Sequence, residues 1–176
     1  MSIEIRRATA DDADAIAEVH VSSWRTTYAG IVDQAYIDAL SVADRATAWK
    51  RWFGKPEASA PDVLVAVDAH GTIVGFISGG EIREPVPGFD AELYAIYLLQ
   101  SHQGIGLGRR FVREWAALAI DRGLRSAVVR VLAQNPAREF YAHLGATVIS
   151  TSTHAVGGKL YPDVLYGWRD LRELAR

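Results

Sequence analysis

The chain has 176 residues, of which 49% are apolar and 23% are charged, as in ordinary globular proteins. Because this length supports one hydrophobic core, we expect a single domain over residues 1–176. Lys and Arg number 19 against 21 Asp and Glu, giving a net charge of −2, so the basic surface that a nucleic-acid partner needs is missing. The lack of cysteine excludes disulfides, a thiolate nucleophile and cysteine-ligated metals.

Neither a targeting segment nor a metal site is expected. The first residues lack the apolar core of a secretory signal, and no apolar stretch approaches the roughly 20 residues that span a bilayer. We therefore expect a cytoplasmic protein without a membrane partner. The five histidines show no ligand spacing such as H-E-x-x-H, which argues against a catalytic metal. They are His20, His70, His102, His143 and His154.

The first third of the chain is predicted to be helical after one short strand. Ile3 and Ile5 alternate with charged residues, which indicates an edge strand with one wet face. Apolar residues at helical spacing predict a first helix over residues 10–23 and one or two short helices between residues 36 and 53. Two prolines and a glycine in residues 54–62 end this helical region.

The remainder is predicted to be rich in strands. β-branched runs at residues 63–67 and 72–78 flank a turn sequence and predict an antiparallel hairpin. The apolar run over residues 91–99 predicts a strand buried on both faces. The elements expected after it are helix 108–122, strand 126–132, helix 136–144, strand 147–151 and strand 164–168. The predicted fold class is therefore α/β, a mixed and mostly antiparallel sheet with helices on both faces.

A glycine-rich loop lies between the apolar strand and the helix that follows it. Its residues are Gln103, Gly104, Ile105, Gly106, Leu107 and Gly108. Glycines let a ligand approach the backbone closely, and a helix N-terminus presents unpaired N–H groups to an anion. Arg109 and Arg110 in the first turn oppose the helix dipole unless an anion is bound. The loop therefore predicts a pyrophosphate site; the alternative is a tight turn whose arginines point into water.

Two familiar phosphate loops are excluded by spacing. A Walker A loop requires Lys followed by Ser or Thr after its last glycine, where this chain has two arginines. A dinucleotide fingerprint requires its third glycine three residues past the second and an acidic residue about 20 residues on. Nucleoside triphosphates and NAD are therefore disfavoured as ligands.

The loop resembles the Q/R-x-x-G-x-G/A signature of the GNAT superfamily of acyl-CoA-dependent N-acyltransferases, through Gln103, Gly106 and Gly108. The segment NPAREFYAHLGA at residues 135–146 resembles that family's second motif, and the resemblance covers nearly the whole chain. It implies a GNAT-like fold and acetyl-CoA as co-substrate. The pyrophosphate would lie on the loop backbone beside Arg109.

The resemblance also implies how the rest of the co-substrate is held. Its pantetheine arm would pair like a strand with Ile96, Tyr97 and Leu98, where two central strands separate. Asn135 would contact the co-substrate, a role compatible with capping the helix that begins at the next residue, Pro136. Dimers are common in the family, so a homodimer is one state that the resemblance allows.

Tyr141 is the predicted general acid. The matching tyrosine of the family lies near the thioester sulfur and can protonate the departing CoA thiolate, and a phenol is a plausible donor to a thiolate. Its helical spacing from Phe140 and Leu144 allows the alternative of core packing.

Glu92 is the predicted base, because an amine must lose a proton to attack a thioester. Strand alternation predicts Glu92, Tyr94, Ile96 and Leu98 on one face. A carboxylate partly buried at the start of an apolar strand would bind a proton more readily. The alternative is a solvated strand end, with Glu81 and Asp90 as the other candidate bases.

The resemblance implies an acceptor site built from the N-terminal helices and the loops near the end of the sheet, and the end of the first helix is the most suggestive segment for it. Trp24 and Tyr28 lie at i and i+4, so their rings share one helix face and could hold an amine. Core packing is an equally good interpretation of Trp24. Trp49, Trp52 and Phe53 are expected in the core.

These residues predict an N-acetyltransferase that moves an acetyl group from acetyl-CoA to a primary amine by direct attack. The acceptor would be a small molecule or a peptide such as a protein N-terminus. Two alternatives remain open: a non-catalytic acyl-CoA-binding sensor or scaffold, and a nucleotide-binding protein unrelated to CoA.

Overall fold

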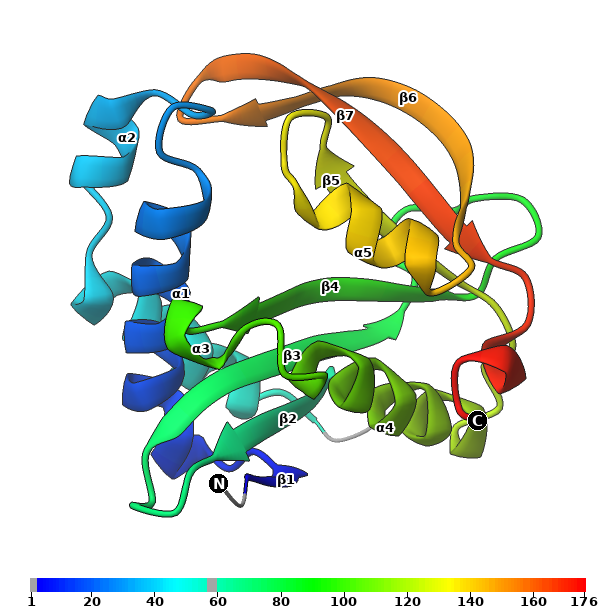
Figure 1. The fold of residues 1–176 in the computed structure, drawn as a ribbon, viewed down its shortest axis with the longest axis horizontal. Coiled ribbons are helices and arrows are strands. Elements are labelled where there is room, and N and C mark those ends of the chain that lie inside the picture. Colours follow the sequence, from blue (N-terminus) through cyan, green and yellow to red (C-terminus); the bar gives the residue numbers. More distant parts are fainter. Residues whose placement is uncertain (1–2, 57–59) are drawn as a thin grey trace.

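The computed structural model describes residues 3–56 and 60–176, whose strands form one seven-stranded sheet in the order β1-β2-β3-β4-β5-β7-β6 (Figure 1). The strands are β1 (Glu4–Arg7), β2 (Asp62–Val67), β3 (Ile73–Glu81), β4 (Ala91–Leu98), β5 (Ala127–Leu132), β6 (Thr147–Val156) and β7 (Lys159–Trp168). Of the neighbouring strands described, β4 and β5 are parallel and all other pairs are antiparallel. The prediction of a mixed, mostly antiparallel sheet is confirmed.

Helices cover both faces of the sheet, as predicted. The helices are α1 (Ala13–Thr27), α2 (Gln34–Asp38), α3 (Val42–Phe53), α4 (Leu107–Asp121) and α5 (Ala137–His143). On one face, fully buried Phe111 and Trp115 of α4 pack with Tyr141 of α5, and these helices lie in front of the strands in Figure 1. On the other face, Ile16 of α1 and Trp49 of α3 pack against the sheet. None of the described helices has the length and apolar content needed to cross a bilayer.

A bulge in β4 changes which side chains share a face. Ser78 of β3 pairs with Ala95 and Gly79 pairs with Leu93, so Tyr94 is left without a partner. The predicted alternation is therefore wrong, because an extra residue reverses the side-chain direction along the strand. Leu93 packs in the α4 cluster with Ile96 and Leu98, whereas Ala95 and Tyr97 pack in the α1 and α3 cluster. The side chain of Glu92, the residue before Leu93, lies on the face of the sheet that α1 and α3 cover.

The strands β4 and β5 separate soon after they begin to pair. Their ladder ends at Leu93 and Val129, so residues 94–98 face a gap rather than a neighbouring strand on that side. The first three residues of β4 are buried and the other five are partly exposed. The prediction of a strand buried on both faces throughout is therefore wrong for its second half.

The last two strands are longer than predicted. β6 and β7 form a hairpin joined by Gly157 and Gly158, which both have positive φ and so suit a two-residue turn. The part of β6 that was not predicted contains polar residues such as Ser152, Thr153 and His154, which lack the apolar pattern of a buried strand. This distal half of the hairpin borders the candidate site.

Candidate active site

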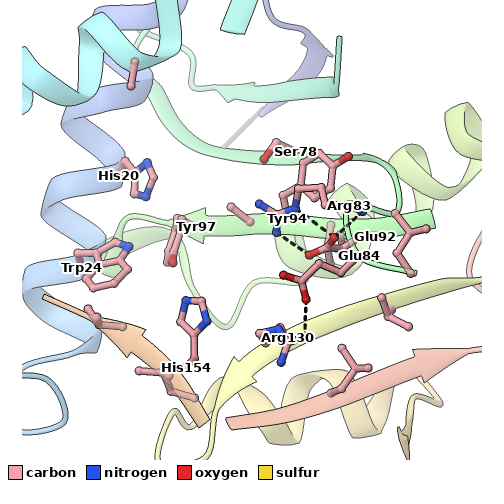
Figure 2. A pocket seen from close by; sticks show the side chains of 18 of the residues that line it. His20, Trp24, Ser78, Arg83, Glu84, Glu92, Tyr94, Tyr97, Arg130 and His154 are labelled. Carbon is pink, nitrogen blue, oxygen red and sulfur yellow. Dashed lines mark hydrogen bonds and ion pairs between the residues drawn. The ribbon is translucent and has the colours of Figure 1, made fainter. Parts of the chain in front are cut away.

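Two cavities meet at the gap between β4 and β5. The glycine-loop cavity, of about 670 Å³, is bordered by residues 103–109 and by α5. The aromatic cavity, of about 800 Å³, is bordered by α1, α3, the β3–β4 loop and β6 (Figure 2). Five residues line both cavities: Tyr28, Tyr94, Ala95, Tyr97 and Arg130. Molecules bound in the two cavities can therefore approach each other through the sheet.

The glycine loop has the backbone that an anion site requires. Gly104 and Gly106 have φ of 73° and 82°, in the left-handed region that favours glycine. Gly106 caps the 15-residue helix α4, whose first turn holds no acidic residue. A Cβ on Gly108 would lie 3.2 Å from the Phe140 ring, so glycine also allows α4 and α5 to approach closely. The first amides of α4 are consequently free to bind an oxyanion.

Most of the predicted co-substrate residues line the glycine-loop cavity. They are Ile96, Tyr97, Leu98, Gln103, Gly104, Gly106, Gly108, Arg109 and Asn135. Ile105 exposes 61% of its surface and Leu107 is buried in the core, so these two offer backbone groups only. Arg110 donates to the carbonyl oxygen of Ile3 at 3.2 Å, which leaves Arg109 as the first-turn arginine that borders the cavity.

Asn135 connects α5 to the boundary between the cavities. Its Oδ1 accepts the amide N–H of Ala137 at 2.9 Å, so the side chain caps the helix start as predicted. Its Nδ2 donates to the Tyr28 hydroxyl at 3.2 Å, and that hydroxyl lies 3.5 Å from the Tyr97 hydroxyl. Burial raises the pKa of both tyrosines, so both remain protonated near neutral pH.

Tyr141 both packs in the core and borders the glycine-loop cavity, so its position is compatible with both predicted roles, core packing and proton donation. Its ring packs against Phe140, Tyr166 and Trp168, and only 6% of the residue is exposed. It also lines the glycine-loop cavity. Burial raises the pKa of its hydroxyl, so the side chain carries its proton at neutral pH.

Glu92 is held by an arginine that the sequence analysis did not identify. The Glu92 carboxylate accepts hydrogen bonds from the Arg83 guanidinium, including Nε to Oε2 at 3.1 Å, and from the Arg83 backbone amide at 3.2 Å (Figure 2). The guanidinium lies 4.4 Å from the centroid of the Tyr94 ring. These hydrogen bonds fix the position of the carboxylate at the wall of the aromatic cavity.

The other two candidate bases differ from Glu92 in their surroundings. Asp90 accepts the backbone amides of Arg125 and Ser126, which gives its carboxylate a structural role at the start of β4 and β5. Glu81 is exposed at the end of β3, and its carbonyl oxygen accepts the Tyr94 hydroxyl. Neither residue lines the aromatic cavity.

Aromatic side chains form much of the second cavity. Trp24 and Tyr28 both line it, with ring centroids 4.3 Å apart. Trp49 is buried in the core as predicted, but it also lines this cavity together with Trp52. The residues that sequence analysis missed are His20, Arg45, Arg83, Glu84, Tyr94, Arg130 and His154. They come from five helices and strands and from the β3–β4 loop and form no motif, so only the fold brings them together.

His20 is a largely buried histidine in the cavity wall, and its imidazole is neutral at pH 7. Its ring stacks on Tyr97 with centroids 5.1 Å apart. Among the described residues its buried Nδ1 has no hydrogen-bond partner. Burial, reinforced by the positive charge of Arg45, lowers the pKa of His20 to about 3.

Comparisons with known proteins agree with this geometry. The sequence model of the family described as "Acetyltransferase (GNAT) family" matches residues 20–146. The chain is 36% identical to the "Uncharacterized N-acetyltransferase YuaI" of Bacillus subtilis, over 98% of this chain and 96% of the relative. It is 27% identical to a spermidine N(1)-acetyltransferase of Thermoplasma acidophilum, over 77% and 81% of the two chains.

A solved structure shares the fold. The PaiA N-acetyltransferase of Thermoplasma acidophilum, determined in complex with coenzyme A, aligns with a TM-score of 0.67 and 23% identity. The alignment covers 93% of this chain and 98% of the other.

The depressed pKa of His20 predicts acid sensitivity. In the unfolded chain this histidine protonates near pH 6.5, whereas in the folded protein it does so near pH 3. Folding therefore loses stability as the pH falls from 6.5 toward 3, by about 2 kcal/mol at pH 5. In the His20→Gln variant, the decrease in unfolding free energy between pH 7 and pH 5, measured with urea, should be smaller by this amount.

The matched control is His70→Gln, at an exposed residue in the turn between β2 and β3. This variant should lose as much stability as the unaltered protein between the two pH values. An equal decrease for His20→Gln and His70→Gln would show that His20 does not cause the acid sensitivity.

Proposed function

Because the chain belongs to the acetyltransferase (GNAT) family, we propose that it transfers the acetyl group of acetyl-CoA directly to a primary amine of a small molecule. Family membership confirms the resemblance found in the glycine loop, and with it an acetyltransferase that uses acetyl-CoA as co-substrate. The observation that carries the proposal is the meeting of two cavities at the β4–β5 gap. One cavity has an anion-binding loop, and the other has an aromatic wall.

The residues of the glycine-loop cavity fit the co-substrate. The free amides at the start of α4 and the side chain of Arg109 would hold the pyrophosphate. In the part of the chain that the structure describes, the β4 backbone from Ile96 to Leu98 has no strand partner toward β5. The Leu98 carbonyl oxygen accepts Gln103 Nε2 at 3.1 Å, so the other peptide groups that point into the gap are available to the amides of the pantetheine arm. Asn135 lies between this arm and Tyr28.

The proposed reaction forms a bond from the amine nitrogen to the acetyl carbon and breaks the bond from that carbon to sulfur. Glu92 accepts the proton that the amine loses, directly or through water, because its carboxylate lines the aromatic cavity and Arg83 fixes its position there. Tyr141, which lines the glycine-loop cavity and is protonated at neutral pH, donates a proton to the departing thiolate.

Release of free thiol from acetyl-CoA tests the function. An enzyme of this kind should release one thiol for each amine acetylated, with turnover that requires both substrates. Acetyl-CoA at about 100 times its Kd should also stabilise the fold by about 2.7 kcal/mol, and ATP or NAD should have little effect. Stabilisation by acetyl-CoA without thiol release across a broad amine panel would favour a binding protein that lacks turnover.

Tyr141→Phe tests the proposed acid. Loss of one hydroxyl should reduce kcat by about 10- to 1000-fold and leave the affinity for acetyl-CoA nearly unchanged. Tyr166→Phe is a matched control, because the Tyr166 ring touches Tyr141 while its hydroxyl accepts from Arg138 and does not line the cavity. Equal turnover in both variants, with chemistry shown to be rate-limiting, would leave Tyr141 with a packing role.

Glu92→Gln tests the proposed base. The variant should have a lower kcat/KM near neutral pH and recover relative to the unaltered enzyme as the pH approaches the pKa of the amine, because solvent then supplies neutral amine. Glu81→Gln is the control for loss of a nearby carboxylate and should keep the original pH profile. A pH-independent offset in Glu92→Gln, or a pH-dependent deficit in Glu81→Gln instead, would contradict the assignment.

A further inference from the structure

The charged residues of the aromatic cavity indicate which charges an acceptor molecule can have. The cavity is lined by five of them: Arg45, Arg83, Glu84, Glu92 and Arg130. Four are in ion pairs. Arg83 binds Glu92, and Arg130 lies 2.9 Å from buried Asp163 and 3.8 Å from Glu84. Figure 2 shows these four at one end of the cavity, with His20 and Trp24 at the other.

Arg45 differs from the other four. In residues 3–56 and 60–176, its guanidinium has no hydrogen-bond or ion-pair partner. It lies on α3 at i−4 from Trp49 and i−7 from Trp52, so the helix presents all three on the face that borders the cavity. Arg45 does not line the glycine-loop cavity. Its charge is therefore directed to the acceptor side rather than to the phosphates of the co-substrate.

A row of rings connects Arg45 to the β4–β5 gap. Arg45 lies close enough to His20 to act on it electrostatically, and His20 stacks on Tyr97, which lines both cavities. Because His20 is neutral at pH 7, it adds no positive charge to this end of the cavity. An acceptor that reaches from Arg45 to the gap would thus lie along aromatic surfaces, with Arg45 as the unpaired charge at its far end.

This arrangement discriminates between classes of amine. A polyamine brings two or more positive charges, but Glu92, one of the two carboxylates of the cavity, is bound by Arg83, and the other, exposed Glu84, lies 3.8 Å from Arg130. Its second ammonium group would have to lie near Arg45, and like charges repel strongly where water is partly excluded. A carboxylate would instead be bound by Arg45 through two parallel N–H···O hydrogen bonds.

We propose that the acceptor is a monoamine that also carries one carboxylate or similar oxyanion, which Arg45 binds while the aromatic walls hold the carbon skeleton. This inference rests on the proposed acetyl transfer. It differs from the polyamine that gives the Thermoplasma relative its name.

Matched acceptors test this class. Thiol release from acetyl-CoA would be measured with L-leucine and L-phenylalanine, with their amides, and with the amines that lack the carboxyl group, isoamylamine and phenethylamine. A series of ω-amino acids from glycine to 5-aminovalerate would measure the spacing between amine and anion, and spermidine would represent polyamines. At least one carboxylate acceptor should have a kcat/KM about 10- to 100-fold above its matched amide or amine, and above spermidine.

Substitutions in α3 test whether Arg45 binds the carboxylate of the acceptor. Arg45→Gln should raise the KM of the carboxylate acceptor by about 10- to 100-fold, with kcat, the KM of acetyl-CoA and the KM of the matched amide nearly unchanged. Arg51→Gln is the control, because Arg51 is an exposed arginine of the same helix outside both cavities. Arg45→Glu should reverse the preference toward diamines, and thermal melting would show that each variant is folded.

The outcomes separate this inference from the proposed function. Turnover that is best with spermidine or with the amines and amides that lack a carboxylate, or an equal effect of Arg45→Gln on all acceptors, would overturn the substrate class and leave acetyl transfer intact. Binding of acetyl-CoA without turnover of any acceptor would overturn acetyl transfer itself, and the substrate class with it.

Discussion

The separation of β4 from β5 is the constraint on which the site depends. Parallel strands normally continue their ladder, but these two share hydrogen bonds only as far as Leu93 and Val129. The bulge at Tyr94 coincides with this point, and bulges increase local twist and bend a strand. The result is a gap in the middle of the sheet where, among the described residues, the facing backbone groups of β4 beyond Leu93 lack a strand partner. Elsewhere in a core such groups would be costly, and here they suit a ligand that supplies the missing hydrogen bonds.

Close packing on the α4 side supports this distortion. A Cβ on Gly79 would lie 2.6 Å from the ring of Trp115, a fully buried residue of α4. Glycine at this position therefore lets β3 lie directly on the helix beside the bulge. The same helix begins at the glycine loop, so one rigid element fixes both the bend in the sheet and the position of the anion site.

The features that could be predicted from the sequence are those that depend on residues close together in the chain. The fold class, the glycine loop, the helix cap at Asn135 and the segment that carries Tyr141 all follow from residues close together in the chain. The face of Glu92 could not be predicted, because an alternating pattern contains no sign of the extra residue at Tyr94. The ion pair with Arg83 was missed for a related reason, since it closes across an irregular loop of residues 82–90 that has no periodicity. His20 and Arg45 looked like ordinary helix residues, and only the packing of α1 against α3 places them beside each other.

Burial shifts the pKa values of three side chains in the wall of the aromatic cavity, His20, Tyr28 and Tyr97. The rings that surround His20 remove water from it and so keep it neutral, and burial in the same region keeps Tyr28 and Tyr97 protonated. Electrostatic interactions are stronger in such surroundings, so Arg45 at the edge of the cavity has more influence on a bound molecule than it would on an open surface. Near the gap, the Arg83–Glu92 pair adds little net charge. In the proposed reaction, selection by charge would occur at Arg45, while the reacting amine would lie among neutral tyrosines, where its uncharged and nucleophilic form would be favoured.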